Sequence, residues 1–125
     1  LATGSMVYEC TRVVRVLLKK GISAGLTNIH TIKPLDAEVI EKSGNFKLIV
    51  TVEEHSITGG LGGAIAEHLA EKDGMPKLLR IGIPDIFPLA GSYQYMLNQC
   101  GLTATSIAEK IEQVLVYVEG YIHDK

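Results

Sequence analysis

The residues best able to do chemistry follow a single apolar run. The segment Leu48–Val52 leads into two carboxylates and an imidazole, and four of the five residues at positions 59–63 are glycine. Carboxylate and imidazole groups transfer protons or bind partners, and free N–H groups at a glycine-rich helix start can hold a phosphate, sulfate or carboxylate. The stretch therefore predicts an interface or anion site. Its expected members are Glu54, His55, Ser56, Gly59, Gly60 and Gly62.

The same stretch lacks a complete catalytic or phosphate-binding motif. No Lys-Ser/Thr pair follows the glycines, and Ile65 interrupts a dinucleotide fingerprint. Neighbours such as Glu53 and Glu54, or His55 and Ser56, point apart on an extended segment. The four histidines are not spaced as zinc ligands. We predict no catalytic, cofactor-binding or metal-ligating residue.

The simpler interpretation of the glycines is that they let a helix and a strand pack closely. On either interpretation, Gly60 or Gly62 is expected where a Cβ would clash or where φ is positive.

The elements that would position this stretch alternate along the chain. The run at 48–52 suits a strand buried on both faces, and Leu61, Ile65 and Leu69 recur at helical spacing. Capping residues and glycines bound the other segments, with Ser5, Asp36 and Thr103 as expected N-caps. We expect helices at about 5–21, 36–44, 60–72, 92–100 and from 103, and strands at 1–3, 22–32, 48–52 and 78–83.

Strand–helix alternation predicts an α/β fold with three layers and a mainly parallel sheet covered on both faces. The segment Leu1–Thr3 is expected between the strand containing Leu26 and the strand containing Val50, with the strand from Leu78 outside Val50. All four strands should be parallel. Because Leu1–Thr3 is short for a strand, we expect residues 1–125 to form one domain, with its first strands truncated, of a longer chain.

Composition narrows the function classes. The chain has 125 residues, is 46% hydrophobic and 21% charged, and carries a net charge of −2. This balance fits a cytoplasmic globular domain and lacks the basic footprint of a nucleic-acid binder. No apolar run is long enough to predict a membrane span. Cys10 and Cys100 lie far apart in helical patterns and are expected to be buried thiols.

Three segments of the chain form a recognisable set by their order and spacing: Asn28–Asp36, Val50–Gly63 and Arg80–Phe87. Together they resemble the C-terminal domain of transketolase, a member of the thiamine-diphosphate-dependent superfamily. The pattern Gly-Leu-Thr before the last helix also fits, and the Glu-Glu-His-Ser form resembles the C-terminal subunit of transketolases split over two chains. The resemblance extends to about Leu115.

The resemblance implies a five-stranded mixed sheet, of which this chain lacks the first, antiparallel strand and half of the second. In the family, thiamine diphosphate and its magnesium lie between two other domains. The resemblance therefore assigns no cofactor-binding or metal-binding residue to this chain. The resemblance also implies that this chain is a non-catalytic accessory domain, which would be inactive alone. The complete enzyme would transfer two-carbon ketol units between sugar phosphates. The implied partners are the pyrimidine-binding and cofactor-binding domains or subunits, within a homo-oligomer.

Two alternatives stay open. The chain could instead end a deoxyxylulose-phosphate synthase or a 2-oxoacid dehydrogenase beta subunit. It could also be a regulatory module in which the glycine turn at 59–63 binds a small anion.

Overall fold

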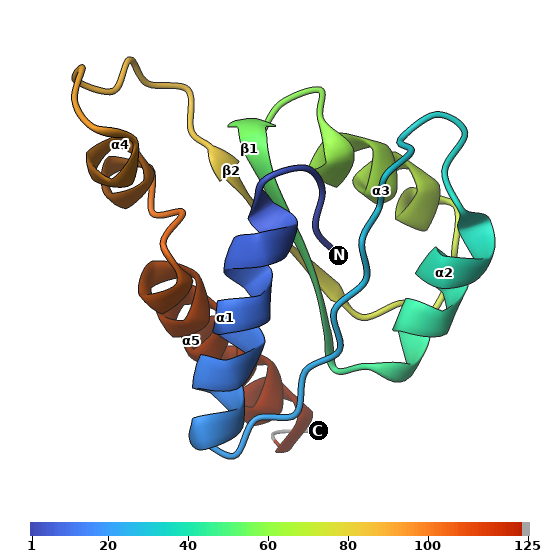
Figure 1. Cartoon of the computed structure of the whole chain (residues 1–125). Coiled ribbons are helices and arrows are strands. Elements are labelled where there is room, and N and C mark those ends of the chain that lie inside the picture. The colour runs from blue at the N-terminus through green and yellow to red at the C-terminus, as the bar shows by residue number, and fades with distance from the viewer. Residues whose placement is uncertain (124–125) are drawn as a thin grey trace.

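A computed structural model describes the backbone of residues 1–123 and the side chains of residues 1–120. Helices cover both faces of a small parallel sheet (Figure 1). The elements are α1 (Met6–Lys19), α2 (Ala37–Lys42), the 3-10 turn η1 (Ser43–Asn45), β1 (Leu48–Ser56), α3 (Leu61–Ala70), β2 (Lys77–Ile83), α4 (Tyr93–Gln99) and α5 (Ala104–His123). The predicted α/β fold with a parallel sheet is confirmed.

The sheet has the predicted order. β1 and β2 pair in parallel, with Val50 opposite Leu79. On the other side of β1, Ala2 forms parallel bridges with both Val52 and Asn28. The start of the chain therefore lies between β1 and the segment that follows α1, as the alternation of elements predicts.

Two local predictions are wrong. The segment at 22–32 is not a continuous strand, because its only bridge within the described chain is the one at Asn28, where Ala2 offers a partner. Ser5 takes the N-cap position of α1 in a helical conformation without capping it, and its hydroxyl donates to Glu54 instead. Asp36 caps α2 as expected, through the Val39 N–H at 3.2 Å.

Two apolar cores fix the layers. On one face of the sheet, α1 packs on α5, and the residues that α1 buries recur at helical spacing: Met6, Cys10, Val13 and Leu17. On the other face, α2 and α3 bury Ile40, Leu61 and Ile65 together with Ile29. β1 contacts α1 and α5 on one face and α3 on the other, so helices cover the strand on both sides.

Candidate functional site

Glu53, which is not among the predicted site residues, is the buried centre of this stretch. It lies within β1, one residue past the apolar run, and its side chain is buried. Its carboxylate accepts the Leu61 N–H at 2.7 Å and the Gly62 N–H at 2.9 Å. These are the first N–H groups of α3, which have no partner inside the helix. A carboxylate also complements the positive end of the helix dipole. Glu53 therefore fastens α3 to the strand.

The glycines make room for this carboxylate. A Cβ on Gly60 would lie 1.9 Å from Glu53 Oε2, and one on Gly82 of β2 would lie 3.2 Å from Glu53 Cγ. A Cβ on Gly62 would lie 2.8 Å from Thr51 Oγ1. Gly60 and Gly62 thus stand where a Cβ clashes, as expected, whereas Gly59 carries the positive φ, of 79°. Close packing explains these glycines.

Glu54 points out of the sheet on the opposite side from Glu53 and is exposed. Its Oε2 accepts the Tyr93 hydroxyl at 2.8 Å and also the Ser5 hydroxyl. Three elements meet here: the end of β1, the start of α1 and the start of α4. The hydrogen bond to Glu54 raises the pKa of Tyr93 above its usual range, because the neutral phenol is the donor. The sequence could not reveal this cluster, since its members come from distant parts of the chain.

The remaining predicted site residues make local contacts. His55 is exposed, with Nδ1 3.1 Å from the carbonyl of its neighbour Ser56. The Ser56 hydroxyl accepts the Thr58 N–H at 3.3 Å. The structure therefore keeps Glu54, His55 and Ser56 on an exposed tip.

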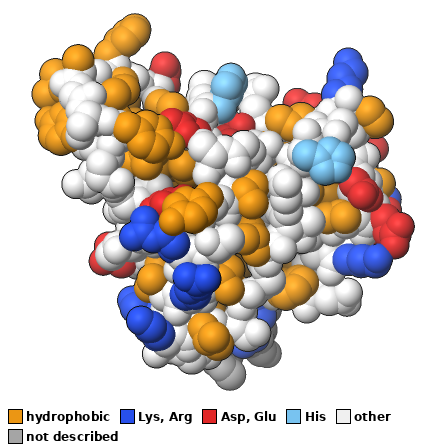
Figure 2. All heavy atoms as spheres, in the orientation of Figure 1, with side chains coloured by type: hydrophobic (Ala, Val, Ile, Leu, Met, Phe, Trp, Pro, Cys, Tyr) orange, Lys and Arg blue, Asp and Glu red, His pale blue; other side chains and the backbone are white. Residues whose placement is uncertain are grey.

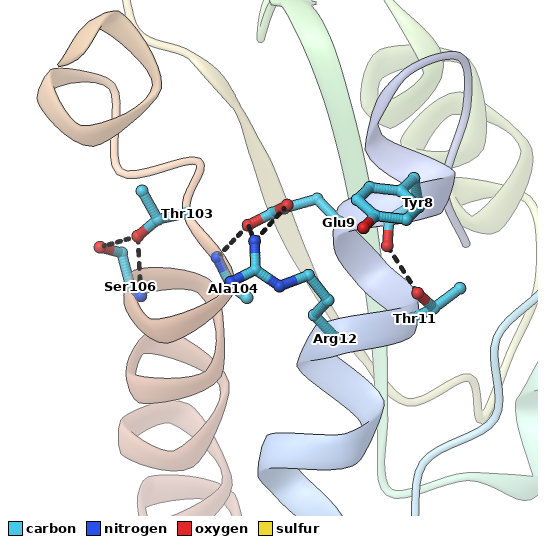
Figure 3. A network of polar contacts seen from close by, with 7 residues as sticks. All are labelled: Tyr8, Glu9, Thr11, Arg12, Thr103, Ala104 and Ser106. Carbon is cyan, nitrogen blue, oxygen red and sulfur yellow. Dashed lines mark hydrogen bonds and ion pairs between the residues drawn. The ribbon is translucent and has the colours of Figure 1, made fainter. Parts of the chain in front are cut away.

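The buried Glu9 of α1 forms a second centre that the sequence did not suggest (Figure 3). Its Oε1 accepts the Ala104 N–H at 2.8 Å, at the first residue of α5. Arg12 Nη1 lies 3.1 Å from both carboxylate oxygens. Thr103 adds a cap to the same helix end by accepting the Ser106 N–H at 3.3 Å, as predicted. Here too, a buried glutamate joins two elements through a helix start.

The described residues contain no group of three or more His, Cys, Asp or Glu side chains that could hold a metal ion. Cys10 and Cys100 are free thiols; Cys10 is buried as expected, whereas Cys100 is only partly buried. Burial raises the pKa of Cys10 to about 11, which leaves it protonated at neutral pH. Within the described part of the chain, no helix combines the length and apolarity of a membrane span.

Comparison with known families decides what this domain is. The family model described as transketolase, C-terminal domain, matches residues 1–107. The chain belongs to this family. The strand-to-helix site and the exposed tip thus belong to a transketolase C-terminal domain.

The relatives include whole enzymes and separate subunits. A provisionally named transketolase C-terminal section of Methanocaldococcus jannaschii is 49% identical over 111 residues, which cover 89% of this chain and 34% of that protein. A 1-deoxy-D-xylulose-5-phosphate synthase of Chlorobium phaeovibrioides is 41% identical, over 89% of this chain and 18% of the enzyme. The solved structure of a split gene transketolase, described as an inactive beta4 tetramer, matches with a TM-score of 0.84 and 32% identity, over 92% of this chain and 38% of the other. This chain therefore spans between 18% and 38% of these relatives' lengths.

Proposed function

We propose that this chain is a non-catalytic assembly domain of a transketolase-like enzyme that transfers two-carbon ketol units between sugar phosphates. The observation that carries the proposal is that the carboxylates at the carboxyl end of β1 form hydrogen bonds within the domain. Glu53 holds α3, and Glu54 joins the starts of α1 and α4. These side chains serve the fold and present a surface.

An exposed apolar segment beside this tip supports an interface role. Ile86, Phe87 and Leu89 in the loop before α4 are exposed, as are Tyr93 and Tyr95 on the helix. Figure 2 shows hydrophobic side chains gathered over α4 and the loop before it. Contiguous exposed apolar surface marks protein–protein contacts. The proposed partners are the pyrimidine-binding and cofactor-binding domains or subunits of the same enzyme, and further copies of this chain, in the cytoplasm.

The cofactor is proposed for the complete enzyme and not for this domain. Thiamine diphosphate with magnesium needs oxygen ligands for the metal, and the described residues offer no acidic cluster for one. The Leu61 and Gly62 N–H groups, which could face a diphosphate, already bond to Glu53. The residues present do not fit the cofactor.

The same contacts weigh against an anion-binding regulatory module, because an internal carboxylate occupies the glycine turn. The second candidate for the complete enzyme is a deoxyxylulose-phosphate synthase, because a relative of this chain is such a synthase. A 2-oxoacid dehydrogenase beta subunit stays open as well. The coding sequence upstream of Leu1 discriminates among the enzyme classes.

Two measurements test whether this domain is non-catalytic. Calorimetry with thiamine diphosphate and magnesium measures cofactor binding, and a coupled assay measures ketol transfer. The 125-residue chain is expected to show neither saturable micromolar binding nor turnover. Either one would overturn the proposal.

Sedimentation of the complete enzyme tests the assembly role. Phe87→Ser and the charge reversal Glu54→Lys should weaken subunit association more than they change kcat. Leu18→Ser is the matched control, since Leu18 is an exposed apolar residue near the far end of α1. Unchanged association in both tip variants would contradict an interface at this tip.

A further inference from the structure

The outer edge of β2 is unpaired in the described structure. β2 pairs with β1 on one side, and no described strand or bridge lies on the other. The Ile83 C=O accepts the Ile57 N–H at 3.0 Å, so the backbone groups of Ile83 point toward β1. Because these groups alternate between the two sides of a strand, those of Leu78, Arg80 and Gly82 point outward.

The accessible part of this edge is the first half of β2. Arg80 is exposed and Leu78 is half-buried, whereas Gly82 is buried. Within the described chain, the outward N–H and C=O groups of Leu78 and Arg80 have no hydrogen-bond partner. A row of free donors and acceptors on an edge strand is a template for pairing with another extended segment.

Arg80 gives this edge a positive charge without a partner. Its guanidinium forms no hydrogen bond or ion pair with any described residue. A Cβ on Gly62 would lie 3.0 Å from Arg80 Cδ and 3.1 Å from Arg80 Cγ, so the aliphatic part of the arginine packs over the first turn of α3. Because this packing already orders the side chain, pairing with a carboxylate would cost less conformational entropy.

The two sides of the edge differ in character. Leu79 and Ile81 join the core on the α5 side of the sheet, whereas Leu78 joins the core on the α3 side, where Arg80 also lies. At the start of β2, the exposed Lys77 places Nζ 4.5 Å from the ring centroid of Tyr117 on α5. An added strand would therefore meet apolar side chains on one side and a cation on the other.

A second copy of β2 suits this edge poorly. An antiparallel two-fold pair that uses the outward groups of both Leu78 and Arg80 sets each arginine opposite the leucine of the other copy. Both arginines then lie on the same face of the joined sheet, at diagonal positions across the two-fold axis. Like charges so placed destabilise a pair of strands, whereas an acidic side chain opposite Arg80 stabilises it. Charge complementarity therefore favours an acidic occupant.

We propose that the outer edge of β2 binds an extended acidic segment of another polypeptide, added as an antiparallel strand with a carboxylate opposite Arg80. The neighbouring side chains of this strand, opposite Leu79 and Ile81, would be apolar. In strand addition, main-chain hydrogen bonds supply affinity and side-chain contacts supply specificity. The specificity here comes from the unpaired arginine.

The probe is the peptide acetyl-Val-Glu-Val-Thr-Val-Ser-amide, titrated into the 125-residue chain at low salt and followed by amide hydrogen exchange. Saturable binding with a Kd below about 1 mM is expected. The amides of Leu78 and Arg80 should gain protection, whereas those of Leu79 and Ile81, which face β1, should not. This alternation separates strand addition from non-specific association.

A charge swap tests the contact with Arg80. The same peptide with lysine in place of glutamate should bind the unaltered chain roughly fivefold more weakly. With Arg80→Glu, the preference should reverse, so that the lysine peptide binds more tightly than the glutamate peptide. Arg15→Glu is the matched control, because it makes the same charge change at an exposed position of α1, and it should leave both affinities unchanged.

Equal binding of the two peptides to the unaltered chain, protection spread evenly along β2, or no saturable binding would overturn the proposal. A chain that sediments as a dimer, with the amides of Leu78 and Arg80 already protected, would also overturn it, in favour of a second copy at this edge.

Discussion

Two buried glutamates hold two helix starts in this domain, and they do so differently. Glu53 accepts N–H groups only eight and nine positions along the chain, at the start of α3. Glu9 accepts an N–H 95 positions away, at the start of α5, and also pairs with Arg12. In the described structure, Glu53 has no ion pair with a basic side chain.

The difference shows how a buried carboxylate can be balanced. Two backbone donors and the end of a helix dipole satisfy Glu53, so any shift of its carboxylate leaves buried N–H groups unpaired. The Glu9 carboxylate accepts one hydrogen bond from the start of α5 and others from Arg12. Because Arg12 is half exposed, water can partly replace its hydrogen bonds to Glu9. We therefore expect substitution of Glu53 to destabilise the domain more than substitution of Glu9.

The largest effect is expected for Glu53→Ala. The change leaves the Leu61 and Gly62 N–H groups unpaired and opens a cavity, so the free energy of unfolding should fall by about 4 kcal/mol. Urea denaturation followed by circular dichroism measures this loss. Glu54→Ala is the matched control, since the exposed neighbour should change stability by no more than about 0.5 kcal/mol. Similar losses in the two variants would show that Glu53 is not the anchor of α3.

The next effect is expected for Gly60→Ala, at about 2 kcal/mol, because the added methyl group must displace the Glu53 carboxylate from its two donors. Gly63→Ala adds the same methyl group in α3, where nothing lies within 4 Å, and should cost nothing.

A double-mutant cycle sharpens this prediction. With Glu53→Ala already present, Gly60→Ala should cost less than about 1 kcal/mol, since its obstacle is gone. If the losses of stability from the two substitutions simply add in the double variant, Gly60 is not there to make room for the Glu53 carboxylate.

The smallest effect is expected at the α1–α5 junction. Glu9→Ala should cost about 1.5 kcal/mol, because one buried N–H loses its acceptor while Thr103 still caps the same helix. Arg12→Ala should cost less than about 1 kcal/mol, because Arg12 is half exposed. Glu109→Ala on the exposed side of α5 serves as the control. If Glu9→Ala proves as costly as Glu53→Ala, the proposed contrast between the two centres is wrong.

Local patterns were sufficient for most of the fold. The apolar spacing in α3, the Asp36 and Thr103 caps, and the apolar run of β1 each act over a few residues, so the sequence shows them directly. Strand–helix alternation then limits the topology, which is why Leu1–Thr3 was placed correctly beside Val52.

Only the tertiary structure decided what the polar residues do. Glu53 and Glu54 are neighbours of one type, yet the strand's alternation buries one under α3 and exposes the other to Tyr93. The Glu9–Ala104 bond and the diversion of Ser5 from its cap depend on contacts between residues far apart in sequence. A single sequence records residue types and spacings, whereas the partner of a buried polar group is fixed only when the layers pack.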